Sequence, residues 1–174
     1  MINDKMVNDK MVNSQKIRAV FFDQDGVLFD SMPCHAKAWE MAMNENGVPY
    51  TAMDCYRNEG RTGSGQRNLI NSLNDTFDGV FTGIISAFDV KYGKPNPEPY
   101  LKAWERSGFK KEECMVVENA PLGTRAAKAA GLFTCAVNTG ILPDADLEAE
   151  HADKVFPNMA ALLKWLQDSA ILSV

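Results

Sequence analysis

The sequence predicts an α/β fold in which a parallel sheet is covered by helices on both faces. Short apolar runs alternate with helical segments along the chain, which is typical of strands joined by crossover helices. Several helical segments begin with a proline in the first turn, where its missing N–H is tolerated. With 174 residues, of which 45% are hydrophobic, the chain favours a single core. The predicted architecture is a Rossmann-like three-layer domain.

Five apolar runs are predicted to be strands. The first, residues 16–23 (KIRAVFFD), is rich in Val and Phe and ends at acidic and glycine residues, as a buried strand entering a loop does. The other predicted strands are residues 84–90, 114–118, 133–138 and, with a weaker pattern, 154–156. Helices are predicted over residues 33–46, 64–74, 97–107, 121–130 and 159–167.

Residues 1–15 repeat a five-residue unit three times, as MINDK, MVNDK and MVNSQ. The unit is too short and too polar for a structural repeat, so we expect a disordered tail ahead of a core over residues 16–174. Residues 54–61 are polar and are expected to be turn-like.

Charge and cysteine content narrow the functional classes. The net charge is −5, and Lys and Arg are scattered and form no basic patch, so we do not expect the protein to bind nucleic acid. No run approaches the roughly 18 apolar residues of a membrane span, so a membrane partner is not expected either. The four cysteines form no C-x-x-C pair, which favours a reduced, cytoplasmic protein.

Two acids follow the first predicted strand in the sequence Asp23-Gln24-Asp25-Gly26. Residues two apart in an extended segment point to the same side, so both carboxylates could face one site, and a glycine permits the sharp exit. Ligands bind beyond the carboxyl ends of strands in such sheets. The alternative is a turn with two solvated acids.

Two further strand ends carry polar groups. Glu118 and Asn119 follow the 114–118 run, where Glu118 could join Asp23 around Mg²⁺, although helix capping by Asn119 is an equally simple reading. Lys94 lies in a proline-alternating loop before a helix, which suits a fixed point charge on phosphate.

These elements together resemble the haloacid dehalogenase superfamily. The segments FFDQDGVLFDSMPCHAKAW, YGKPNPEPYLKA and VVENAPLGTRAAKAAG are similar to its β-phosphoglucomutase-like phosphatase branch, over about residues 16–60 and 62–160. The resemblance implies that Asp23 is the nucleophile that forms an aspartyl-phosphate. It implies that Asp25 is the acid and base, and that Lys94 offsets the developing charge.

The resemblance also implies a Mg²⁺ cofactor held by Asp23, Asp25, Glu118 and Asn119. Many relatives carry an Asp where this chain has Asn119, so we expect weaker metal affinity. Four more residues belong to the expected site. Thr62, Gly63 and Ser64 would bind phosphate, with Thr62 also counted as catalytic, and Arg61 would recognise a substrate phosphate or sugar hydroxyl.

The match to the family is incomplete between the segments that contain Asp23 and Lys94. Only about 70 residues separate Asp23 from Lys94, which leaves a cap remnant around residues 32–61 and no apolar strand before Thr62. The second strand of the family sheet is therefore expected to be missing. We expect lower stability and self-association through exposed sheet edges, or replacement of the strand by residues 54–61.

The predicted function is Mg²⁺-dependent hydrolysis of a small sugar phosphate through an aspartyl-phosphate. There are two alternatives. One is a phosphosugar mutase of the β-phosphoglucomutase type, and the other is an impaired remnant that only binds phosphate and metal. If the site forms, the Asp23 and Glu118 carboxylates should lie about 4 to 5 Å apart, with the Lys94 nitrogen on the opposite side of Asp23.

Overall fold

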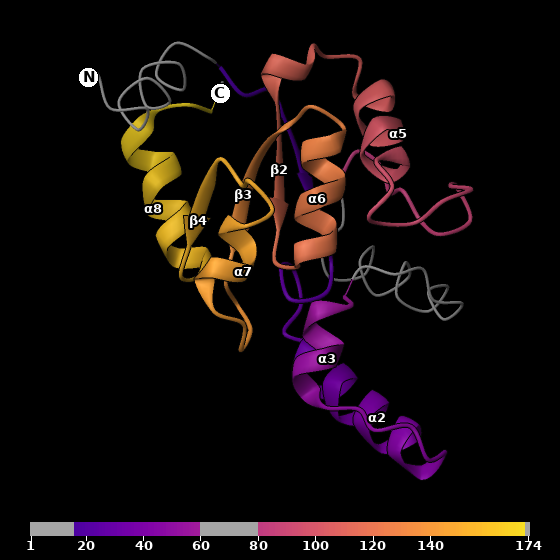
Figure 1. The fold of residues 1–174 in the computed structure, drawn as a ribbon. Helices are drawn as coiled ribbons and strands as arrows, with labels where there is room; N and C mark the ends of the chain where they lie inside the picture. Colours follow the sequence, from indigo (N-terminus) through magenta and orange to yellow (C-terminus); the bar gives the residue numbers. More distant parts are fainter. Residues whose placement is uncertain (1–15, 60–79, 173–174) are drawn as a thin grey trace.

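The computed structural model describes residues 16–59 and 80–172. Within these ranges four parallel strands form one sheet, with helices on both faces and a helical pair beyond one end (Figure 1). The sheet order is β1 (Ala19–Phe22), β2 (Cys114–Glu118), β3 (Phe133–Val137) and β4 (Lys154–Phe156). The predicted fold class is confirmed. The predicted tail over residues 1–15 and the predicted helix over residues 64–74 lie outside the described residues.

The described helices lie close to the predicted ones. They are α2 (Met32–Glu45), α3 (Ala52–Arg57), α5 (Glu98–Ser107), the 3₁₀ turn η1 (Lys111–Glu113), α6 (Pro121–Ala129), α7 (Asp144–Glu148) and α8 (Met159–Ser169). A proline occupies the first turn of α2, α5 and α6, as the sequence predicted. Neither α3 nor α7 was predicted. None of the helices in the described ranges is long and apolar enough to cross a membrane.

Strand β2 is the centre of the core and divides it into two layers. Its alternate residues Cys114 and Val116 pack against α5 and α6, while Met115 and Val117 pack on the side covered by α8. All five residues of β2 are buried. A strand buried on both faces reads as a continuous apolar run, which is why its bounds could be predicted.

The polar segment that was expected to be turn-like begins as a helix. Thr51 caps α3 by accepting a hydrogen bond from the Asp54 backbone N–H, and the Asp54 carboxylate accepts one from the Thr51 backbone in return. This reciprocal capping box stabilises the first turn despite the polar composition. Residues 54–57 lie within α3, so the prediction that residues 54–61 replace a strand is wrong for that part of the segment.

The predicted strand over residues 84–90 is wrong as well. Ser86 and Asp89 form a turn instead, in which the Asp89 carboxylate accepts hydrogen bonds of 2.7 Å from both the backbone and the hydroxyl of Ser86. Side chains of this kind offer the backbone an alternative to a ladder. Among the described residues β1 pairs with β2 alone, so no described strand lies beside its other edge. Self-association through that edge stays a prediction.

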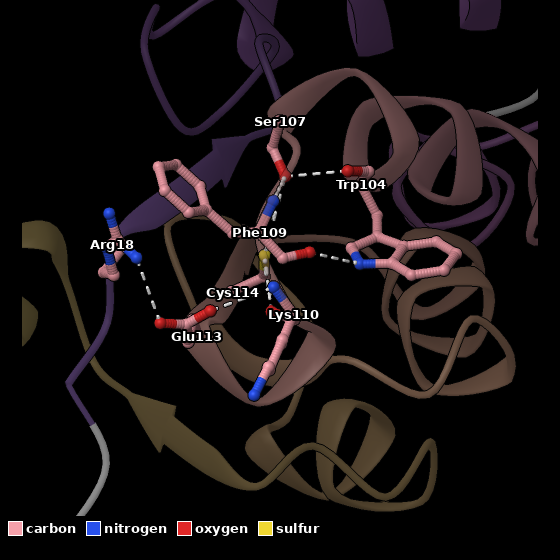
Figure 2. Close-up of polar contacts among 7 residues, drawn as sticks. All are labelled: Arg18, Trp104, Ser107, Phe109, Lys110, Glu113 and Cys114. Carbon is pink, nitrogen blue, oxygen red and sulfur yellow. Dashed lines mark hydrogen bonds and ion pairs between the residues drawn. The ribbon is translucent and has the colours of Figure 1, made fainter.

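Contacts around the loop after α5 join the amino-terminal ends of β1 and β2 (Figure 2). The Arg18 side chain donates to Glu113 and its guanidinium lies over the Phe109 ring, 4.3 Å from the centroid. The Trp104 indole N–H donates to the Phe109 carbonyl at 2.9 Å. A backbone bond of 2.8 Å from Arg18 N to the Glu113 carbonyl sets the register. These contacts therefore fix the register of β1 and β2, whose carboxyl ends lie at the opposite edge of the sheet.

The four cysteines differ sharply in exposure. Cys55, Cys114 and Cys135 are buried, and Cys34 near the start of α2 is exposed. Burial raises the pKa of the Cys55 thiol to about 11. The buried thiols therefore behave as small hydrophobic side chains.

Candidate active site

The carboxyl ends of β1 and β2 bring two acids together. Asp23 directly follows β1, and its backbone N–H donates to the Val117 carbonyl at 2.9 Å, which continues the β1–β2 ladder. Glu118 is the last residue of β2 and is completely buried. Two side chains that leave adjacent parallel strands at the same edge must lie close together.

Lys94 joins these two acids. Its Nζ lies 2.5 Å from Asp23 Oδ1 and also contacts Glu118 Oε1. Because both carboxylates contact one ammonium, Asp23 Oδ1 and Glu118 Oε1 lie no more than about 5 Å apart. The predicted convergence is therefore present. The predicted placement of Lys94 on the far side of Asp23 is wrong, because the ammonium lies between the two carboxylates.

The ion contacts shift the pKa of Lys94. Its side chain is only 12% exposed. Burial alone would lower the pKa, but the negative charges of Asp23 and Glu118 outweigh burial and raise it well above its ordinary value. Lys94 is therefore a permanent positive charge against the Oδ1 atom of Asp23.

The loop that carries Lys94 is held by the start of α5. The Glu98 carboxylate accepts hydrogen bonds from the backbone N–H groups of Lys91 and Tyr92, at 3.0 and 2.8 Å. Asn96 accepts from the Glu98 backbone N–H at 2.9 Å. The prolines predicted a stiff loop, and these hydrogen bonds add to its rigidity.

Both oxygens of the Glu118 carboxylate accept hydrogen bonds from the protein. Its Oε2 accepts the backbone N–H groups of Asn119 and Ala120, at 2.9 and 3.1 Å. Its Oε1 accepts the Tyr100 hydroxyl at 2.7 Å as well as Lys94. Burial, followed by the charge of Asp23, raises the pKa of Glu118, and Lys94 opposes that rise. Four protein donors surround this carboxylate.

Asp25 is oriented by a serine from the segment that leads into α2. The Ser31 hydroxyl donates to Asp25 Oδ1 at 2.6 Å. The turn between them needs Gly26, whose φ of +77° is unfavourable for other residues, and a Cβ there would lie 2.9 Å from the Asn119 side-chain carbon. Thr139 fixes the same turn by donating to the Gly26 carbonyl at 2.5 Å.

Asn119 carries the donor atom best suited to a metal. Its side chain is 7% exposed and its Oδ1 accepts no hydrogen bond within the described ranges. A buried carbonyl oxygen without a donor is costly unless a cation or water satisfies it. The atom fits the oxygen preference of Mg²⁺.

The set of metal donors is sparse. Residues 16–59 and 80–172 contain no group of three or more His, Cys, Asp or Glu side chains arranged to hold a metal. Among the predicted ligands, the Asp23 carboxylate and the Asn119 amide oxygen are the groups whose oxygens protein donors in these ranges do not fully occupy. Mg²⁺ often binds through one or two carboxylates and keeps several waters, so this set is compatible with it.

Glu59 is a further acid near the site that the sequence reasoning missed. It lies two residues after α3, and burial followed by the charges of Asp23 and Asp25 raises its pKa to about 7. Glu59 opens the segment EGRTG, which resembles a substrate-facing loop of the family and also contains Arg61. Arg61, Thr62, Gly63 and Ser64 lie outside the described residues, so their predicted roles stay predictions.

The raised pKa of Glu59 predicts a pH-dependent stability. The folded protein retains this proton up to about pH 7, whereas an unfolded chain releases it near the ordinary value of 4.5. The free energy of unfolding should therefore fall between pH 4.5 and 7, by up to about 3 kcal/mol from this group. Glu59→Gln, which mimics the protonated acid, should melt about 5 to 10 °C higher than the parent at pH 8 without metal.

The control for this measurement is Glu148→Gln, since Glu148 is exposed on α7. Melting curves in a chelator at pH 4.5 and pH 8 should show a gain for Glu59→Gln at pH 8 alone. An equal gain at both pH values would contradict the placement of Glu59 beside the other acids.

Comparisons with known proteins identify the class to which this sheet and site belong. Residues 61–137 match the model of the haloacid dehalogenase-like hydrolase family. A solved structure from Bacteroides vulgatus, provisionally named a β-phosphoglucomutase, is 32% identical and superposes with a TM-score of 0.84 over 95% of this chain and 98% of its own. The chain belongs to the haloacid dehalogenase-like hydrolase family. Phosphatases and β-phosphoglucomutase-like proteins are among the members that it matches.

Curated relatives match over different lengths. An uncharacterized protein of Haemophilus influenzae is 26% identical over 181 residues, which covers 69% of this chain and 90% of that protein. The alignment includes about 120 residues of this chain, so about 60 of its 181 positions have no counterpart in this chain. Hexitol phosphatase A of Escherichia coli is 44% identical over 54 residues, 31% of this chain and only 25% of the enzyme.

Proposed function

We propose that this protein hydrolyses small sugar or polyol phosphates with Mg²⁺, through an aspartyl-phosphate on Asp23. The observation that carries the proposal is the pairing of Asp23 Oδ1 with Lys94 at the carboxyl edge of the sheet. The substrate class is that of hexitol phosphatase A, which shares 44% identity over its matched segment.

The two oxygens of Asp23 have separate tasks in this proposal. Oδ1 is held by Lys94, and Oδ2 has no donor among the described residues. Oδ2 therefore attacks phosphorus, and the new bond forms as the bond from phosphorus to the leaving oxygen breaks. Lys94 offsets the negative charge that develops there.

Asp25 transfers the proton in both halves of the reaction. Its Oδ1 accepts the Ser31 hydroxyl, which leaves Oδ2 to donate a proton to the leaving alcohol oxygen. In the second half Asp25 takes a proton from water, the water oxygen bonds to phosphorus, and the bond from phosphorus to Asp23 breaks. Alcohol and inorganic phosphate are released and the enzyme is regenerated.

The metal would be held by the Asp23 carboxylate, the Asp25 backbone carbonyl and Asn119 Oδ1, where it supplies positive charge for the phosphoryl oxygens. Glu118 was predicted as a ligand. Because its oxygens already accept four protein donors, we propose that it serves as the buried counter-ion of Lys94.

A mutase is the second candidate, favoured by the provisional name of the Bacteroides vulgatus structure. The same residues would serve both reactions, since a sugar hydroxyl can replace water in the second half. Incubation with a hexose 1-phosphate and Mg²⁺ separates them. We expect free sugar and phosphate, whereas conversion to a hexose 6-phosphate would support the mutase.

A remnant that binds phosphate without turnover is the third candidate, because about 60 positions of the alignment with the Haemophilus relative have no counterpart in this chain. Phosphate release from a panel of sugar and polyol phosphates tests it directly. Turnover that a chelator stops and Mg²⁺ restores would support hydrolysis. Saturable phosphate binding without turnover on any member would support the remnant.

A further inference from the structure

Tyr100 is a buried residue in contact with Glu118 and with Lys94, the ion-pair partner of Asp23. It lies in the first turn of α5 and is 5% exposed. Its hydroxyl donates to Glu118 Oε1 at 2.7 Å, and the Lys94 nitrogen lies 5.3 Å from the centroid of its ring.

Tyr100 and Lys94 share one acceptor atom. Both donate to Glu118 Oε1, while Lys94 also donates to Asp23 Oδ1. A carboxylate oxygen that already accepts a hydroxyl proton attracts a second donor less strongly. The Tyr100 hydroxyl therefore weakens the attraction between Glu118 and the Lys94 ammonium. The ammonium then interacts more strongly with Asp23.

We propose that Tyr100 is a positioning residue that sets how Lys94 is shared between the buried Glu118 and the nucleophile Asp23. This inference rests on the proposed function, in which Lys94 offsets charge at the reacting phosphoryl group. Without the hydroxyl, Glu118 Oε1 loses a donor and draws Lys94 toward itself. The ammonium then lies farther from the atom where charge develops.

Tyr100→Phe tests the inference because it keeps the ring, which packs with Val116 and Ala126, and removes the hydroxyl alone. We expect kcat to fall about 10- to 100-fold with KM within about 3-fold, since an electrostatic contact that matters in the transition state lowers kcat. The matched control is Tyr56→Phe, a buried tyrosine of the α2–α3 region that should retain full kcat.

A double-mutant cycle with Glu118→Gln separates positioning from packing. If Tyr100 acts through the Glu118 charge, then Tyr100→Phe should lower kcat by less than about 2-fold in the Glu118→Gln background. A packing role predicts the same fold loss in both backgrounds, and that additivity would overturn the inference. A kcat for Tyr100→Phe within 2-fold of the parent would overturn it too.

Two further outcomes keep the test decisive. If Tyr100→Phe does not fold, Tyr100→Met takes its place in both backgrounds, because Met fills the space without a hydroxyl donor. The inference then requires a loss of at least about 10-fold in kcat with Glu118 present, and a loss of the same size in the Glu118→Gln background would overturn it. Full turnover of Asp23→Asn would reject the proposed function itself. Loss of turnover in Asp23→Asn together with a fully active Tyr100→Phe would reject only the role of Tyr100.

Discussion

Asp23→Asn should abolish phosphate release, with kcat lowered by at least about 10⁴-fold. An amide oxygen is a poor nucleophile, and the neutral side chain also loses the ion pair with Lys94 at 2.5 Å. Two measurements check this: steady-state phosphate release, and acid-quenched trapping of labelled phosphate on the protein. The parent should retain acid-stable label that hydroxylamine releases, and the variant should retain none.

Asp168→Asn is the matched control, because Asp168 is an exposed acid that pairs with Lys164 on α8, far along the chain from the site motifs. It should match the parent in both assays. Unchanged turnover of Asp23→Asn would reject Asp23 as nucleophile. Turnover without any trapped label in the parent would instead point to direct attack by water.

Gly123→Ala should lower the free energy of unfolding by about 3 kcal/mol. Alanine normally favours a helix by about 1 kcal/mol over glycine, so propensity alone predicts the opposite sign. At this position of α6, however, a Cβ would lie 2.5 Å from Glu118 Oε2 and nearer still to Oε1. The carboxylate would have to leave its four donors inside the core, and displacement of a buried charge from its partners costs several kcal/mol.

Urea denaturation of the parent and variant measures this change, and loss of phosphate release should accompany it. The control is Ala129→Gly on the same helix, where the exposed position should cost only about 1 kcal/mol through propensity. A stabilised Gly123→Ala would mean that the Glu118 carboxylate does not occupy the space over α6.

The sequence could predict those parts of the fold that depend on local pattern. The first four residues of β2 are apolar because both of its faces are buried, so this strand could be located from the sequence. Asp23 follows β1 and Glu118 ends the neighbouring β2, so their convergence follows from parallel pairing. The stiff loop of Lys94 follows from its prolines.

Other features depend on contacts that no local pattern reveals. The run over residues 84–90 has the composition of a strand, but Ser86 and Asp89 close a turn there. Lys94 lies between Asp23 and Glu118 because of the direction that its long side chain takes, which the sequence alone does not determine. Glu59 comes near the site from a segment outside the sheet, and its raised pKa reflects burial and neighbouring charge together.

The uneven exposure of the cysteines makes this protein convenient for spectroscopy. Cys34 is the exposed one of the four thiols in the chain, and it lies three residues after Ser31, the hydrogen-bond partner of Asp25. A maleimide dye or spin label should therefore react at a single position without mutagenesis. The label would sit on α2, and its signal would report any movement of this helix relative to the sheet when a phosphate ester binds.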